Sequence, residues 1–294
     1  MVAKLVVTKD TGELLFDTTK ICYGLVKSGN LAYLENWARY YLKSAQLDPS
    51  NGENWAPESE TPPRGDPAYG FTVTNALSPI VFITGPGCLN GVSRSGNSMT
   101  FIYINADENT KFYCFDLMAN NIAGSPYLKT FLEDGRISFN SLQPPLNVVA
   151  VVSAPGKPAP RPGNQSAWYD FTYSGGYNVQ RRGMTGPNYS PALDSRVDIA
   201  LAGEEYAAHL PWSRNAICLN GSAAAGYTVS VSEGAYGRTG GISFMFGAAG
   251  ATTIGNTPAA GDGSVPAGNA FRNIPDLAPT ALVIRTAGLP FPYQ

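Results

Sequence analysis

Two short segments of the chain, 123 residues apart, share one order of residue types. Residues 10–19 read DTGELLFDTT and residues 133–142 read EDGRISFNSL. The corresponding pairs are Gly12 and Gly135, Phe16 and Phe139, and Asp17 and Asn140. An Asp-Gly or Asp-x-Gly turn between short apolar runs is typical of a β-hairpin, because glycine adopts positive φ and aspartate bonds its own backbone. The sequence therefore predicts related hairpin modules at about 4–28 and 127–152.

The exchange of Asp17 for Asn140 indicates what kind of repeat this is. A catalytic carboxylate could not become an amide without losing its charge, whereas a residue that caps a turn can be either. We predict that Gly12 and Gly135 form the turns and that the two phenylalanines are buried anchors. The pattern favours a structural module used twice, by duplication or by convergence, over a doubled active site.

The rest of the chain consists of short apolar and aromatic runs separated by glycine and proline. The 294 residues include 32 Gly, 23 Pro and 16 Tyr, and only 14% are charged, against roughly 25% in an average soluble domain. This composition disfavours a helical bundle and predicts an all-β fold of two sandwich-like domains with long Gly/Pro-rich loops. The proline-rich stretch 153–165 places the boundary near residue 156, which separates domains 1–155 and 156–294.

Two segments carry further expectations. Leu31, Leu34 and Ala38 recur at helical spacing, which predicts one short helix near 30–45, although the aromatic content there also fits a pair of strands. Residues 247–271 are nearly free of charge and irregular. They are expected to form a long loop that orders against a partner, or a stretch buried between subunits.

Charge and hydropathy disfavour several classes of protein. The net charge is −2, and the strongest basic stretch is the two arginines of QRRG at 180–183, so nucleic-acid binding is disfavoured. No apolar run approaches the roughly 20 residues of a membrane span, so no membrane insertion is expected. The start of the chain lacks the apolar region of a signal peptide, which predicts synthesis in a cytoplasm, with retention there or release by lysis.

Few residues suggest catalysis or metal binding. The four cysteines are far apart and flanked by apolar residues, which predicts buried free thiols. They are Cys22, Cys88, Cys114 and Cys218. The only histidine, His209, lies in the apolar context EYAAHLPW and is interpreted as structural. We therefore assign no catalytic residue, cofactor or metal.

A cluster of aromatic residues leaves a second function open. Tyrosine and tryptophan can stack on sugar faces, but they suit a sandwich core or a subunit interface at least as well. The candidates for glycan or surface contact are Trp168, Tyr169, Tyr173, Tyr177 and Trp212. A glycoside hydrolase would need two carboxylates, for which Asp170, Glu204 and Glu205 are available beside aromatics. A carbohydrate-binding or polysaccharide-depolymerising module is thus the alternative function.

The hairpin segments also resemble a known group of proteins. The opening LVVTKDTGELLFDTT and the block from FYCFDLM to LNVVAVV resemble β-modules of tail proteins from long-tailed bacteriophages. The resemblance covers residues 1–28 and about 111–152. It implies a structural protein of the virion tail, in the tip, baseplate or fibre-associated parts, made in the host cytoplasm. The partners it implies are other tail or baseplate proteins, further copies in a symmetric, often trimeric, setting, and a bacterial surface receptor.

Overall fold

The computed structural model describes residues 6–8, 10, 12, 14–17, 19–38, 40–43, 47–48, 50–57, 65–180, 193–220, 227–250, 253–256, 266 and 268–293. These residues form strands and two short 3-10 helices, η1 (Gly52–Asn54) and η2 (Gly163–Gln165). The predicted all-β, sandwich-like fold is confirmed. Much of 247–271 and the side chain of Phe16 lie outside the described residues.

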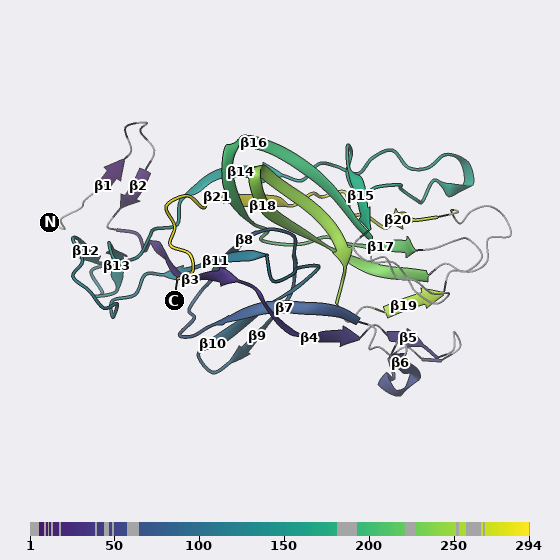
Figure 1. The fold of residues 1–294 in the computed structure, drawn as a ribbon, viewed down its shortest axis with the longest axis horizontal. Helices are drawn as coiled ribbons and strands as arrows, with labels where there is room; N and C mark the ends of the chain where they lie inside the picture. The colour runs from purple at the N-terminus through teal and green to yellow at the C-terminus, as the bar shows by residue number, and fades with distance from the viewer. Residues whose placement is uncertain are drawn as a thin grey trace.

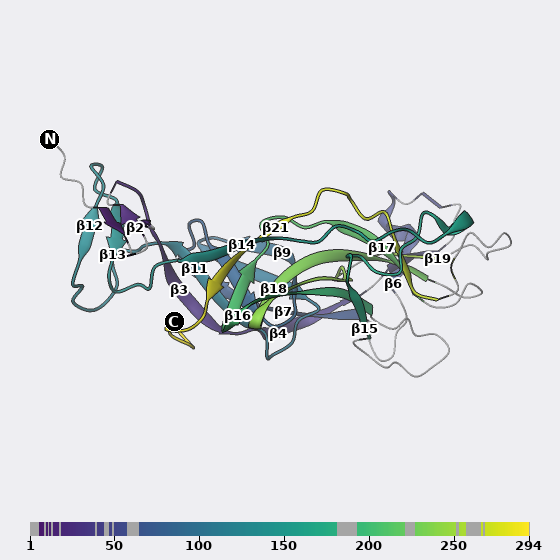
Figure 2. The ribbon, with the colours of Figure 1, turned by 90° about the horizontal axis from the view of Figure 1, so that it is seen from above.

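The molecule is elongated, and two small hairpins lie together at the end that carries the N-terminus (Figures 1 and 2). The first hairpin consists of β1 (Val6–Thr8) and β2 (Leu14–Asp17). The second consists of β12 (Lys129–Phe131) and β13 (Ile137–Asn140). Each forms its own two-stranded sheet, so both modules stand apart from the larger sheets.

Four antiparallel strands form a separate sheet, in the order β4, β7, β10, β9. Their bounds are Ala32–Ala38 for β4, Gly65–Val73 for β7, Ser98–Ile104 for β10 and Cys88–Ser95 for β9. The sheet packs on the largest sheet through a buried aromatic cluster. Phe71 of β7 stacks on Phe112 of the opposing sheet with ring centroids 3.6 Å apart, and Phe101 of β10 stacks on Phe71. This face-to-face packing makes a sandwich.

The largest sheet has 13 strands. They are β3 (Tyr23–Asn30), β5 (Tyr40–Leu42), β6 (Trp55–Pro57), β8 (Ile80–Thr84), β11 (Lys111–Leu117), β14 (Val148–Ser153), β15 (Tyr177–Gln180), β16 (Leu193–His209), β17 (Asn215–Asn220), β18 (Tyr227–Ala248), β19 (Thr253–Asn256), β20 (Ala270–Arg272) and β21 (Thr280–Arg285). The long strands β16 and β18 pair with each other and curve through the middle of the molecule (Figure 1). A second core forms against them around Phe244 and Phe246, both fully buried.

Strands from both sides of the predicted boundary near residue 156 share this largest sheet. β14 pairs antiparallel with β21, and β8 contacts both β16 and β18. The proline-rich segment after β14 is also bonded to the body, since Ala154 N–H donates to Pro279 O and Ser174 N–H donates to Gly156 O. Residues 1–155 and 156–294 therefore do not form two separate sheets, because strand pairing joins residues that are far apart in sequence.

The predicted helix near 30–45 is wrong, because β4 and β5 occupy that range. β4 pairs antiparallel with β7, which supplies partners for its backbone. Leu31 is buried whereas Leu34 is 40% exposed, so the helical spacing does not mark one buried face. The aromatic residues decide in favour of a strand: Tyr33 lies opposite Tyr69 of β7, with edge-to-face rings 5.9 Å apart.

Candidate functional site

The two hairpins have the same backbone pairing. The pairs are Val6 with Asp17, Val7 with Phe16 and Thr8 with Leu14 in the first hairpin, and Lys129 with Asn140, Thr130 with Phe139 and Phe131 with Ile137 in the second. Every pair of the first hairpin maps onto the second by adding 123, and both ladders are irregular at the same step. The two hairpins therefore share one strand register.

The turn glycines also correspond in conformation. Gly12 has φ +83° and Gly135 has φ +82°, which is the left-handed region that favours glycine. No atom lies within 4 Å of where a Cβ would stand on either residue, so backbone conformation and not crowding selects glycine. Both turns therefore form as the sequence predicts.

The residues that end the two hairpins cap the chain in the same way. Thr19 N–H donates to Asp17 Oδ1 at 2.9 Å, and Leu142 N–H donates to Asn140 Oδ1 at 3.1 Å. Both capping residues are buried, while Phe139 is only partly buried. Asp17 and Asn140 thus each accept a hydrogen bond from the N–H two residues further on, and the side chain of Phe139 is half-buried.

The chain segments that leave the hairpins cross each other in antiparallel fashion. Leu25 N–H donates to Pro144 O, and Leu146 N–H donates to Tyr23 O. Gly24 sits at the crossing, where a Cβ would stand 2.8 Å from Gln143 Cβ. Glycine suits this position because a Cβ would clash with the side chains of Gln143 and Met118. The crossing lies beside both hairpins. We call the two hairpins the hairpin end, and define it as the described residues within 6–17 and 127–140.

The hairpin end exposes apolar side chains to solvent. Tyr127, just before β12, is fully exposed, and Phe131 and Val6 are 48% and 45% exposed. The tip of the second hairpin carries an exposed ion pair, in which Arg136 Nε lies 2.6 Å from Asp134 Oδ2. Tyrosine and phenylalanine are enriched in the cores of protein interfaces, and charged pairs suit their polar rims. The hairpin end is therefore the candidate binding surface of this chain.

The five aromatic residues considered for glycan contact do not lie on one exposed face. Trp168 and Tyr173 are buried in two different clusters. Tyr169 is partly buried beneath Lys157 Nζ, and the ring of Tyr177 is 40% exposed with its hydroxyl donating to Asp198. Trp212 is 42% exposed. Only Tyr177 and Trp212 are therefore open enough for a sugar to stack on.

The carboxylates considered for glycoside hydrolysis are ion-paired. Asp170 accepts hydrogen bonds from Arg161, and Glu204 pairs with Arg285 at 2.7 Å. Glu205 pairs with Lys111 at 2.9 Å. Partial burial of Glu205 acts to raise its pKa, but hydrogen bonds from Lys111 and Thr286 outweigh it and lower that pKa. A general acid needs a raised pKa, so Glu205 is unsuited to that role.

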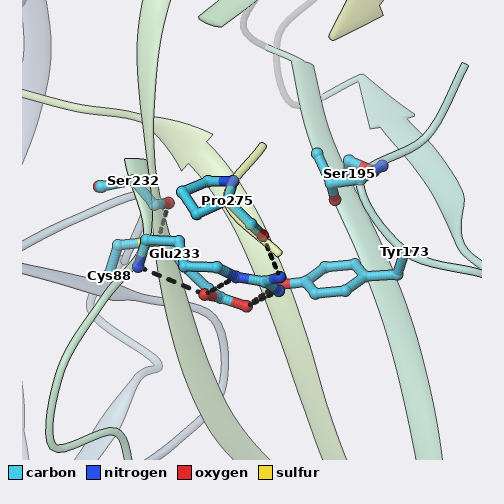
Figure 3. Close-up of polar contacts among 8 residues, drawn as sticks. Cys88, Tyr173, Ser195, Ser232, Glu233 and Pro275 are labelled. Carbon is cyan, nitrogen blue, oxygen red and sulfur yellow. Dashed lines mark hydrogen bonds and ion pairs between the residues drawn. The ribbon is translucent and has the colours of Figure 1, made fainter. Parts of the chain in front are cut away.

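A buried polar cluster joins four segments of the second core (Figure 3). Glu233 of β18 accepts two hydrogen bonds from the Arg214 guanidinium, from Nε at 2.8 Å and from Nη2 at 2.7 Å. Tyr173 Oη donates to Glu233 Oε1 at 2.7 Å, and Arg214 Nη1 donates to Pro275 O. Burial and the Glu233 charge raise the pKa of Tyr173 well above its ordinary value. Because all three side chains are buried, the cluster is structural.

Sequence reasoning missed this cluster. Arg214 and Glu233 were not singled out, although Glu233 is the one acidic residue between Thr228 and Tyr236, in a run otherwise made of apolar, serine and glycine residues. An isolated charge in a run that reads as a buried strand predicts a buried partner of opposite sign. That signal indicates that a partner exists, but the identity of the partner requires the fold.

His209 is partly buried and lines a small cavity. The cavity is about 20 Å³, room for about one water molecule, and is also lined by Tyr103, Ser213 and Glu233. Burial lowers the pKa of His209, and its Nδ1 lies 2.9 Å from Val81 O. Glu233 is held by Arg214 and Tyr173, so it is not placed to orient the imidazole for catalysis.

The cysteines behave largely as predicted. Cys88, Cys114 and Cys218 are buried free thiols, and Cys22 is a partly buried free thiol. Within the described residues, no three His, Cys, Asp or Glu side chains lie close enough together to hold a metal ion. Neither of the two helices that the structure describes has the length or apolarity that a membrane crossing needs.

Comparison of the chain with protein-family models, with curated proteins and with solved structures gives no match. The functional assignment therefore depends on the residues and the geometry of this chain alone.

Proposed function

We propose that the protein is a structural component of a phage tail that binds neighbouring tail or baseplate proteins through its hairpin end. The observation that carries the proposal is the repeat of one hairpin geometry, in the same register, at one end of an elongated molecule. Two copies of one module at the same end of the molecule suit a shared docking surface. The likeness of these same segments to tail-protein modules supports that role.

Two further observations support binding over catalysis. The carboxylates near the aromatic residues are neutralised by arginine or lysine partners, as for Asp170 and Glu204. The described surface at the hairpin end presents Tyr127 and Phe131, and exposed aromatic residues of this kind anchor protein interfaces. The proposed partners are tail proteins, further copies of this chain and a bacterial surface receptor.

Immunogold labelling of purified virions tests the location. Label at the tail tip or baseplate is the expected result, and particles without label would overturn the proposal. The surface is tested by the double variant Tyr127→Ser/Phe131→Ser in an incorporation assay. Loss of aromatic anchors should reduce incorporation about tenfold or more, since one such anchor contributes about 2 kcal/mol. The matched control is Leu77→Ser/Leu277→Ser, which removes two exposed apolar residues outside the hairpin end.

A carbohydrate-binding or depolymerising module is the second proposal, favoured by the exposed rings of Tyr177 and Trp212. Incubation with host surface polysaccharide and an assay for reducing ends tests the enzymatic form. If the assay is positive, Asp170→Asn should abolish the activity, and unchanged activity would reject that residue as catalytic. Binding without cleavage should weaken in Tyr177→Ala and Trp212→Ala.

A further inference from the structure

β14 is an edge strand of the largest sheet. It pairs with β21 on one side, and within the described residues no strand pairs with its other side. Ala154 N–H donates to Pro279 O, and antiparallel pairs alternate between bonded and non-bonded residues. Counting back along the ladder, Val151 and Ser153 therefore direct their N–H and C=O groups away from β21. These groups form an open row of donors and acceptors.

The side chains of β14 include none of the residues that prevent an edge strand from pairing with another strand. Its six residues read VVAVVS, with no charge, glycine or proline. Val151 is 65% exposed and Val148 is 37% exposed. Exposed edges in proteins are normally protected by charges, by proline or by a covering segment, because an uncharged β-branched edge is a template for another strand.

Several other edge strands of the two larger sheets have such protection. β9 carries Arg94, β4 carries Glu35 and β6 ends in Pro57. The outer side of β3 is covered by the end of the chain, since Ser28 and Tyr293 exchange two backbone hydrogen bonds. β15 is short and polar, with the sequence YNVQ. β14 thus differs from β3, β4 and β9 in being both free of charge and uncovered within the described residues.

We propose that β14 pairs antiparallel with β14 of a second copy of this chain, about a two-fold axis near the middle of the strand. An isologous pair places each strand opposite its own sequence, so any charge would face itself or a near neighbour of the same kind. β14 has none, and residues 148–152 read VVAVV in both directions. Two such strands can therefore satisfy each other's outward backbone groups and pack valine against valine or alanine.

This inference goes beyond the proposed tail function, because it names the self-association surface and holds for any cellular role. It joins two 13-stranded sheets into one continuous sheet across the axis. With this pairing the basic unit is a dimer, whereas the resemblance to tail proteins implies a trimeric setting. If the virion labelling fails, the proposed β14 dimer is unaffected. If the dimer is not found, the result of the virion labelling is unaffected.

The decisive variant is Val151→Lys, which places like charges near each other across the axis while replacing a largely exposed side chain. The matched control is Val92→Lys on β9, where Val92 is 45% exposed on another edge strand. Sedimentation or light scattering should show a dimer for the native chain and for Val92→Lys, and a monomer for Val151→Lys. A native chain that stays monomeric on concentration, or a Val151→Lys variant that stays dimeric, would overturn the proposal.

Hydrogen exchange of the native protein gives an independent measurement that needs no variant. The amides of Val151 and Ser153 should exchange at least about tenfold more slowly in concentrated than in dilute samples, since pairing protects them. The amide of Val152 faces β21 and serves as the internal control, with little dependence on concentration. Equal exchange of Val151 at both concentrations would show that this edge stays open.

Discussion

The two hairpins have the same backbone geometry but make different hydrogen bonds to the rest of the molecule. In the first, Asp17 accepts hydrogen bonds from the backbone and the hydroxyl of Thr19. In the second, Asn140 caps its own turn and also donates from Nδ2 to Ala119 O at 2.9 Å. A carboxylate could not make that donation. The Asp-to-Asn difference therefore reflects what the neighbouring chain presents at each position, while the turn itself accepts either residue.

A proline accounts for a second difference. Cys22 N–H, just after the first hairpin, donates to Ser138 O of β13. The residue 123 positions after Cys22 is Pro145, which has no N–H to return the equivalent bond to the first hairpin. β13 is thus bonded both by β12 and by Cys22. A repeated module can therefore keep the same strand register although the chain around each copy makes different hydrogen bonds to it.

The largest expected effect comes from Asn140→Asp. The substitution places a carboxylate against Ala119 O in a fully buried position, which should lower the free energy of unfolding by about 3 kcal/mol. The matched control is Asp17→Asn, which keeps the capping oxygen and should cost less than about 1 kcal/mol. Urea unfolding of both variants measures the difference. Equal losses in the free energy of unfolding would show that Asp17 and Asn140 make equivalent contacts with the rest of the molecule.

The turn glycines should respond equally. Gly12→Ala and Gly135→Ala each force an alanine into the left-handed region, at a cost of about 1–2 kcal/mol. Because neither site has a neighbour within 4 Å of the new Cβ, backbone strain is the whole effect. Hydrogen exchange of the amides in each hairpin should report local opening by similar amounts. A clearly larger effect in one hairpin would break the equivalence of the turns.

A smaller effect should distinguish the strands. The hydroxyls of Thr130 and Ser138 lie 2.7 Å apart across the second hairpin, whereas the equivalent residues of the first are Val7 and Leu15. Thr130→Val should cost about 1 kcal/mol, because it removes this partner of the buried Ser138 hydroxyl. Thr130→Ser keeps a hydroxyl and should behave nearly as the native chain does in the same unfolding measurement.

The smallest expected effect is a pH dependence confined to the second turn. Hydrogen bonds to Asp134 from the backbone N–H and then the guanidinium of Arg136 lower its pKa below the ordinary value. The charged form therefore stabilises the turn above the unfolded pKa, and this contribution is lost as the pH falls through the folded pKa. The residue equivalent to Asp134 in the first turn is Thr11, which does not titrate in this range.

Nuclear magnetic resonance can follow this difference through the amide of Gly135 during an acid titration. The signal should shift in the acidic range with a midpoint below that of an unperturbed aspartate. The variant Asp134→Asn should remove the transition. An unchanged transition in that variant would assign it to another carboxyl group.

The errors of sequence reasoning lie where long-range pairing outweighs local pattern. Leu31, Leu34 and Ala38 have the spacing of a helix, yet pairing with β7 makes that segment a strand. The proline-rich stretch near residue 156 reads as a domain boundary, yet β14 and β21 pair across it. In both cases the deciding partner is distant in the chain, and no local propensity reports it.

What the sequence determined by itself is local: the all-β class, the two turns at Gly12 and Gly135, and the caps at Asp17 and Asn140. These depend on the φ that glycine allows and on side chains that bond their own backbone, so a few neighbouring residues suffice. Only the tertiary structure decided that Arg214 meets Glu233 and that β14 is left as an open edge. Those outcomes depend on which distant strands come together, because burial and pairing are properties of the whole chain.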